Sequence, residues 1–161
     1  LPQDIRWHYI GQLQSNKSKL LASVPNLWAV ETVDTVKRAE ALNAACKGRS
    51  NPVHIFVQVN TSNEENKGGV APANCEELCR FIIEHCSSLN LLGLMTIGSV
   101  AHSGQVPNPD FQTLVGLQTQ LSTSLGRPLE LSMGMSHDYE HALELGATNV
   151  RVGSSIFGTR A

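Results

Sequence analysis

The sequence predicts an α/β fold, a parallel (β/α) barrel of which about six of eight strands are present. Three observations support this prediction. Short apolar runs rich in β-branched residues alternate with helical patterns along the chain. No GxGxxG turn of a dinucleotide-binding fold follows a predicted strand. Glycine-serine turns follow the last two strands, where barrels often bind phosphate. We therefore expect one partial barrel domain over residues 1–161.

The first elements are short. Residues 5–10 (IRWHYI) are the first predicted strand, Ser15-Asn16 can cap a helix that ends near Leu21, and residues 27–30 are the second strand. The next helix starts at the N-cap candidate Asp34 and stops at Gly48. Its expected inward positions are Val36, Ala39, Leu42 and Cys46.

Residues 53–60 (VHIFVQVN) are the clearest strand, because valine and isoleucine alternate there with other side chains. The helix at about 72–86 carries Cys75, Cys79 and Cys86 on one apolar stripe. No C-x-x-C pair occurs, and free cysteine is more often a small buried hydrophobe than a metal ligand. We assign these cysteines to the core.

The second half repeats the alternation. Its predicted elements are a strand at 91–97, a loop at 98–109, a helical face from Phe111 to Leu125, a strand at 129–133, a helix at 137–145 and a strand at 149–152. The loop is long and rich in glycine and proline, which is typical of functional loops.

Composition narrows the class of protein. Hydrophobic content of 41% and charged content of 16% are typical of a globular chain. The net charge of -2 gives no general attraction to nucleic acid or to anionic membranes. The longest apolar runs are far too short to span a bilayer, and no signal-peptide pattern opens the chain. We expect a cytoplasmic protein with neither nucleic acid nor membrane as a partner.

The two glycine-serine turns are candidates for a phosphate site. Gly134 and Gly153 allow the backbone to approach a ligand closely, and nearby hydroxyl groups add donors. The hydroxyl residues are Ser132, Ser136, Ser154 and Ser155. A simpler role for Ser136 is the N-cap of the following helix. Two such turns on adjacent strand ends favour phosphate over this alternative.

Two charged or polar strand residues are further candidates. Arg151 alternates with Val150 and Val152, so its side chain points away from theirs. Inside a barrel an arginine needs an anion or an acceptor, whereas an outward arginine would pair with a helix carboxylate. His8 lies on the first strand, where packing is a more common role than chemistry.

Residues 137–141 spell H-x-x-E-H, the pattern of inverted zinc proteases. A metalloprotease needs a third ligand, and the acid Glu144 lies only three residues after His141 on the same short helix. We interpret the pentapeptide as a helix turn and predict no metal site.

Five strings, in order and along the whole chain, carry a resemblance to a known family. They are WHYIGQLQSNK (7–17), VQVNTSNEENKGG (57–69), GLMTIG (93–98), LSMGMS (131–136) and NVRVGSSIFG (149–158). Together they resemble the pyridoxal phosphate homeostasis proteins, also called proline synthetase co-transcribed homologues. The resemblance implies a barrel like the N-terminal domain of alanine racemase. It also implies a pyridoxal 5'-phosphate (PLP) carrier without established turnover, which buffers and delivers vitamin B6.

The resemblance implies site residues too. It places Ser132, Ser136, Gly153 and Ser154 at the phosphate, around Gly134, with Arg151 at the ring nitrogen or the phosphate, and His8 and Asn16 nearby. The family's Schiff-base lysine belongs to an earlier strand, in a stretch like VSKT. The chain's five lysines lie in helices, first turns or polar loops, at 17, 19, 37, 47 and 67. We therefore expect no covalent attachment at the family position.

Two other functions stay open: a fragment of a racemase-like PLP enzyme, and a phosphate-binding barrel without cofactor. A racemase would need an added domain that bears a catalytic tyrosine. The family also allows a mitochondrial pool in eukaryotes. An incomplete barrel exposes two strand edges, so we expect an unstable or self-associating chain.

Overall fold

The computed structural model describes residues 1–160 and contains six parallel strands in the sheet order β1-β2-β3-β4-β5-β6. The strands are β1 (Trp7–Tyr9), β2 (Leu27–Val33), β3 (Val53–Gln58), β4 (Leu89–Met95), β5 (Glu130–Met135) and β6 (Asn149–Arg151). The helices are α1 (Ser18–Ala22), α2 (Val36–Cys46), α3 (Cys75–His85), α4 (Pro109–Leu125), α5 (Tyr139–Glu144) and α6 (Ser154–Phe157). Three 3-10 turns add η1 (Ser15–Lys17), η2 (Pro72–Asn74) and η3 (Val100–His102).

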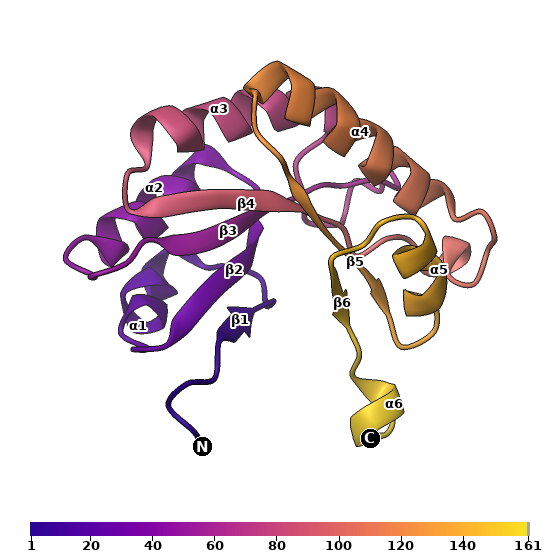
Figure 1. The fold of residues 1–161 in the computed structure, drawn as a ribbon, viewed down its shortest axis with the longest axis horizontal. Helices are drawn as coiled ribbons and strands as arrows, with labels where there is room; N and C mark the ends of the chain where they lie inside the picture. Colours follow the sequence, from indigo (N-terminus) through magenta and orange to yellow (C-terminus); the bar gives the residue numbers. More distant parts are fainter. Residues whose placement is uncertain (161) are drawn as a thin grey trace.

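The sheet curls into an open half-barrel. Helices α1 to α5 lie along its convex side, while the N-terminus and α6 lie at the open side (Figure 1). Neighbouring strands join by parallel ladders throughout. The half-barrel with six strands confirms the fold predicted from alternating strand and helix patterns.

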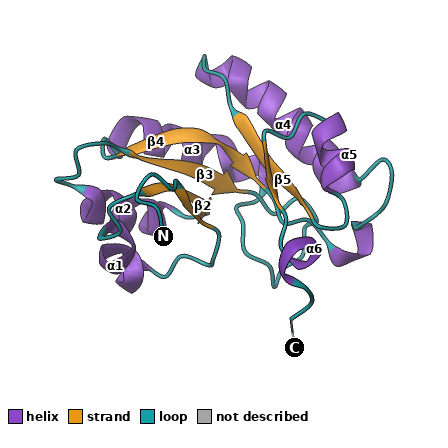
Figure 2. Cartoon of the chain, turned by 60° about the horizontal axis from the view of Figure 1, so that its bottom comes forward, coloured by secondary structure: helices purple, strands orange, loops and turns teal. Residues whose placement is uncertain are grey.

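The main hydrophobic core lies between the sheet and the convex-side helices. On β3 it takes Val53, Ile55 and Val57, as the alternation predicts. Phe56, which alternates with them, instead joins Ala29 and Met95 in a small cluster on the concave side. In Figure 2, α3 lies behind β3 and β4, while α4 and α5 lie beside β5. Cys46, Cys75, Cys79 and Cys86 are all buried, which confirms their assignment to the core.

Helix α2 begins one residue later than predicted. Its N-cap is Thr35, whose side chain accepts the N–H of Arg38. The sequence predicts Asp34 as the cap, but the Asp34 carboxylate instead accepts hydrogen bonds from the Arg38 guanidinium and the N–H of Gly69. The expected inward position of Val36 is wrong, because its side chain is 40% exposed. The other three expected inward residues of α2 are buried.

Strand β2 extends three residues beyond the predicted end at Val30. The polar pair Glu31 and Thr32 interrupts the apolar pattern, yet both side chains are buried with hydrogen-bond partners. Thr32 donates to the carbonyl of Gly11, and Glu31 binds groups on the concave side. The strand can continue because distant segments supply hydrogen-bond partners to these two buried side chains. The local sequence pattern does not show which residues those partners are.

The loop at 98–109 leads into α4, where the side chain of Asn108 accepts the N–H groups of Asp110 and Phe111. Gly126 ends the helix with φ +65, in the left-handed region that glycine adopts without strain. Helix α5 is shorter than predicted, and the turn after β6 contains the short helix α6. No helix within residues 1–160 is long and apolar enough to cross a membrane.

Candidate functional site

The two glycine-serine turns lie side by side at the carboxyl edge of the sheet. Strands β5 and β6 are neighbours, and Met135 pairs with Arg151 in their ladder. The next residues of each strand therefore leave the sheet at the same place. The sequence predicted this juxtaposition from strand order alone.

Ser136 and the start of α6 form a converging donor arrangement. The Ser136 hydroxyl oxygen accepts the N–H of Gly153 at 3.1 Å and the N–H of Ser155 at 3.2 Å. Gly153, Ser154 and Ser155 are exposed to solvent. Ser136 does not cap α5, whose N-cap is Asp138. One oxygen already sits where two backbone donors point, and this is the contact that a phosphate oxygen would make.

Arg151 points to the concave side, which is the inward one of the two directions that the sequence left open. Its Nη1 donates to Ser132 Oγ at 2.6 Å, and its Nη2 donates to the Thr96 carbonyl at 2.7 Å. Nη1 also lies 4.0 Å from Glu31 Oε2. Burial lowers the pKa of Arg151, and the charge of Glu31 opposes that effect. The guanidinium is therefore a desolvated cation beside the two turns.

Glu31 is the centre of the concave polar cluster, and its side chain is 1% exposed. Oε1 accepts from Asn149 Nδ2 at 2.5 Å and lies 2.7 Å from His8 Nδ1. Oε2 accepts from Ser132 Oγ at 2.5 Å. Burial alone would raise the pKa of Glu31, but hydrogen bonds from His8 and Ser132 and the charge of Arg151 outweigh it. The pKa therefore lies below its usual value, and Glu31 is ionised.

This cluster reaches across the half-barrel. His8 comes from β1, Glu31 from β2, Ser132 from β5, and Asn149 and Arg151 from β6. Strand β2 borders only β1 and β3 in the sheet. The Glu31 contacts with β5 and β6 are therefore contacts across the concave space, not between ladder neighbours.

The structure separates the remaining predicted site residues. Ser132 is 0% exposed, and its hydroxyl already bonds Glu31 and Arg151. Gly134 is buried with φ +97, and a Cβ there would lie 2.6 Å from the Ala142 Cβ. Gly134 therefore admits α5 against β5. Asn16 is exposed in η1, and no hydrogen bond within residues 1–160 joins its side chain to the cluster.

The H-x-x-E-H pentapeptide has another structural role. His141 Nε2 accepts the backbone N–H of Asn108 at 3.1 Å, and Nδ1 lies 3.5 Å from Glu144 Oε2. His141 thus anchors the loop at 98–109 to α5. Among residues 1–160, no three His, Cys, Asp or Glu side chains are grouped to hold a metal ion.

Four of the five lysines are exposed, and Lys67 is half-buried. Lys67 lies in the loop after β3, where its ammonium donates to Glu64 at 3.2 Å and to the Gly98 carbonyl at 3.2 Å. It lines a cavity of about 140 Å³ together with Thr96 and Gly98. This lysine is held in a loop, as the sequence predicts, but at the sheet's carboxyl edge.

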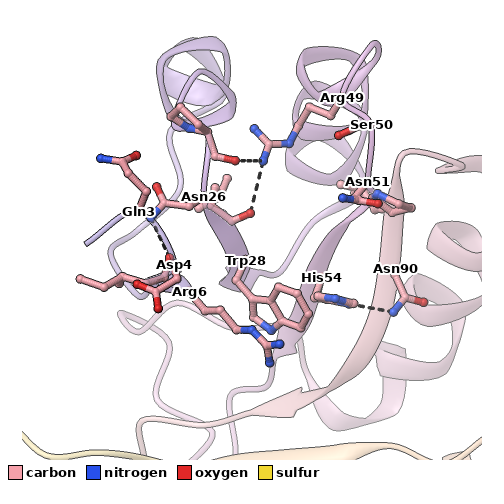
Figure 3. Close-up of a pocket in the computed structure, with 15 residues that line it drawn as sticks. Gln3, Asp4, Arg6, Asn26, Trp28, Arg49, Ser50, Asn51, His54 and Asn90 are labelled. Atoms are coloured by element: carbon pink, nitrogen blue, oxygen red, sulfur yellow. Dashed lines mark hydrogen bonds between the residues drawn. The ribbon is translucent and has the colours of Figure 1, made fainter. Parts of the chain in front are cut away.

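A cavity of about 740 Å³ lies at the amino ends of β1 to β4 (Figure 3). Arg6 stacks on Trp28 at 4.2 Å, and His54 bonds Asn90 at 2.8 Å. Arg49 donates to four backbone carbonyls at its rim. The Nε of Arg49, by contrast, is buried without a hydrogen-bond partner among the described residues.

Sequence reasoning missed Glu31, Asn149 and Thr96. Glu31 did carry a signal, since an acid within the buried run LWAVETV requires a partner inside the fold. Asn149 sat at the edge of a predicted strand without a distinguishing pattern. Thr96 contributes its backbone carbonyl to Arg151, and sequence does not show that contact.

Comparison with known proteins places this arrangement in a family. The alanine racemase N-terminal domain family matches residues 6–161. A Schizosaccharomyces pombe protein named pyridoxal phosphate homeostasis protein is 52% identical over 161 residues. This chain belongs to the family of pyridoxal phosphate homeostasis proteins. The human protein of the same name is 47% identical over 163 residues. The chain spans 68% of the S. pombe relative and 59% of the human one.

Two solved structures share the fold of this chain. PipY of Synechococcus elongatus with PLP bound matches at a TM-score of 0.80 with 29% identity. That match covers 98% of this chain and 72% of PipY. Alanine racemase of Clostridium difficile matches at a TM-score of 0.72 and 17% identity, over 95% of this chain and 39% of the enzyme. The latter likeness concerns the fold alone.

Proposed function

We propose that this chain provides the phosphate-binding half of a PLP site and acts as a non-catalytic cytoplasmic carrier in vitamin B6 homeostasis. The observation that carries the proposal is the convergence of the Gly153 and Ser155 N–H groups beside the buried cation Arg151. The names of the relatives and the PLP bound to PipY support it.

The residues present fit a phosphate ester. The two backbone donors at the start of α6 now donate to Ser136 Oγ, and a phosphate oxygen that takes the place of this hydroxyl would receive both of them, with the exposed Ser154 beside it. Arg151 supplies positive charge where burial strengthens its attraction to an anion. Bound there, PLP supplies an aldehyde that reacts with amines. Ser132 we assign to Arg151, because its hydroxyl is already engaged by two side chains.

We propose further that none of the five lysines of this chain serves as the attachment residue. Four are exposed, and the Lys67 ammonium is engaged by a carboxylate and a carbonyl oxygen. An attachment lysine needs a partly desolvated amine free to attack the aldehyde.

Borohydride trapping tests both parts. The chain would be mixed with PLP, reduced and mapped by peptide mass spectrometry, while binding is followed with and without inorganic phosphate. We expect weak binding that phosphate competes away, and no stoichiometric lysine adduct. Arg151→Gln should weaken binding about tenfold, and the exposed control Arg80→Gln should leave it unchanged. A reduced adduct at one lysine would contradict the assignment.

The carrier proposal also excludes turnover by this chain. Incubation with PLP and L-alanine should give no D-alanine above the rate of free PLP. Enzyme-dependent racemisation would favour a racemase-like fragment instead. Phosphate binding that is indifferent to the pyridoxal ring would favour a barrel without cofactor.

A further inference from the structure

We propose that Glu31 is a positioning residue for Arg151, acting through the Ser132 hydroxyl across the half-barrel. The choice of PLP phosphate as the ligand rests on the proposed function. The contacts among Glu31, Ser132 and Arg151 are present in the structure without a ligand. Glu31 sits on β2, whereas Ser132 and Arg151 sit on β5 and β6. No sequence pattern linked these residues.

The hydrogen-bond directions in this chain are fixed by chemistry. An arginine can only donate, and an ionised carboxylate can only accept. Ser132 therefore accepts from Arg151 Nη1 at 2.6 Å and donates its proton to Glu31 Oε2 at 2.5 Å. The direction of the two Ser132 hydrogen bonds cannot reverse while Arg151 and Glu31 keep their charges. The three groups thus form one ordered chain from cation to anion.

Glu31 does not contact a ligand itself. Its side chain is 1% exposed, and His8 and Asn149 occupy Oε1 while Ser132 occupies Oε2. A buried carboxylate with this many partners keeps its place when a ligand arrives. It provides a fixed counter-charge 4.0 Å from the Arg151 guanidinium.

Arg151, by contrast, has donor capacity left over. Its two described bonds use one N–H of Nη1 and one of Nη2, out of five N–H groups on the guanidinium. The Ser132 hydroxyl and the Thr96 carbonyl accept hydrogen bonds from the two terminal nitrogens of the Arg151 guanidinium. Without Glu31, the Ser132 hydroxyl could rotate and the guanidinium would lose one of these supports. Arg151 would then bind an anion less precisely.

A double-mutant cycle tests this inference with pyridoxine 5'-phosphate, which lacks the aldehyde, as the probe. Glu31→Gln and Arg151→Gln should each weaken binding about tenfold, at the lower end of losses seen for residues that support metal ligands. The double variant should bind within about twofold of Arg151→Gln, because Glu31 acts only through the arginine. Glu130→Gln, an exposed acid on β5, should bind like wild type.

A structural role would give a different cycle. If Glu31→Gln lowers affinity by the same factor in the Arg151→Gln background, or not at all in wild type, the inference fails. Should Glu31→Gln not fold, Ser132→Ala replaces it. That variant removes the link but leaves Glu31 with His8 and Asn149, and it should show the same loss and the same non-additivity.

A ligand-free readout separates this inference from the proposed function. In nitrogen-15 NMR spectra, slow rotation of the held Arg151 guanidinium should give distinct Nη signals in wild type and Glu130→Gln. Those signals should average in Glu31→Gln and Ser132→Ala. Unchanged signals in both variants would overturn the positioning role. If instead wild type binds neither pyridoxine 5'-phosphate nor inorganic phosphate, the proposed function fails and the NMR result still decides the positioning role.

Discussion

At the scale of single residues, nearby positions on β5 and directly after it have different tasks. Ser132 is enclosed and links Arg151 to Glu31, while Ser136 lies at the surface and receives the α6 amides. Gly134, between them, lets α5 approach the strand. One string, SMGMS, thus combines a serine that links two buried charges, a glycine needed for packing and a serine that accepts two backbone N–H groups. Residue type and spacing alone did not distinguish these roles.

Gly134→Ala should destabilise the fold. The substitution combines φ +97 with a Cβ 2.6 Å from the Ala142 Cβ and 3.0 Å from the Tyr139 Cα. We expect a loss of about 2–4 kcal/mol in the free energy of unfolding, measured by urea titration at pH 7. Gly116→Ala is the matched control, since its Cβ meets nothing within 4 Å inside α4. It should stabilise by about 0.5–1 kcal/mol. Equal stability of the two variants would contradict the packing role.

Glu31 should make the fold sensitive to acid. Its folded pKa lies below the unfolded value of about 4.3, so its ionised form stabilises the protein fully above that pH. That stabilisation is lost as pH falls through the folded pKa. Urea titrations at pH 7, 5, 4 and 3 should show a drop below pH 4.

In Glu31→Gln the same titrations should start about 2 kcal/mol lower at pH 7 and fall less steeply in acid. The neighbouring charged or titratable groups, His8 and Arg151, remain in both proteins. The difference between the two curves therefore reports the carboxylate. An identical acid drop in wild type and variant would show that other groups, such as Asp110, cause it.

At the scale of elements, the loop at 98–109 is fixed by the first turn of α4. The Asp110 carboxylate accepts the Ser99 N–H at 2.8 Å and lies 2.8 Å from His102 Nδ1. Burial alone would raise the pKa of Asp110, but the hydrogen bonds from Ser99 and His102 outweigh it and lower the pKa. The loop is long but anchored at both of its sides, by Asp110 and by His141.

Asp110→Ala should release this loop. Hydrogen exchange of the amides in residues 99–103 should speed up at least about tenfold, with a loss of about 2–3 kcal/mol in stability. The control is Thr113→Ala, an exposed position on the same helix, which should change stability by less than about 0.5 kcal/mol. Unchanged protection in the loop would show that other contacts hold it.

At the scale of the molecule, the half-barrel leaves β1 and β6 each paired on one side only within the described sheet. Unpaired N–H and C=O groups at a sheet edge favour pairing with another chain. Apolar side chains are also exposed near these edges, including Trp7 on β1 and Phe157 on α6. We therefore propose that the isolated chain self-associates.

Analytical ultracentrifugation should show a sedimentation coefficient that rises with concentration, and the thermal midpoint should rise with it. Trp7→Lys places a charge on the β1 edge and should shift the chain toward monomer. Leu20→Lys, on α1 and 69% exposed, should not. A sharp, concentration-independent melt of a wild-type monomer would count against self-association.

Sequence determined the strand order, most helix positions and the meeting of the two glycine-serine turns. The strands and helices follow from the local periodicity of each chain segment. The meeting of the two turns follows from the parallel order of strands that are consecutive in the sequence. Alternation placed Arg151 opposite to the neighbouring valines, but the structure decided that this direction is inward. What failed locally was limited to caps, element ends and one inward position: Thr35 caps α2 in place of Asp34, and Val36 is exposed.

Tertiary structure decided how the site is held. Glu31 meets Ser132 and Asn149 over separations of 101 and 118 residues, and no local period encodes such contacts. Curling of the sheet brings β2 opposite β5 and β6, and the buried charges then find their partners across the concave space. The sequence alone marked the two glycine-serine turns as candidates for a phosphate site. Only the fold showed that a buried glutamate supports the arginine beside them.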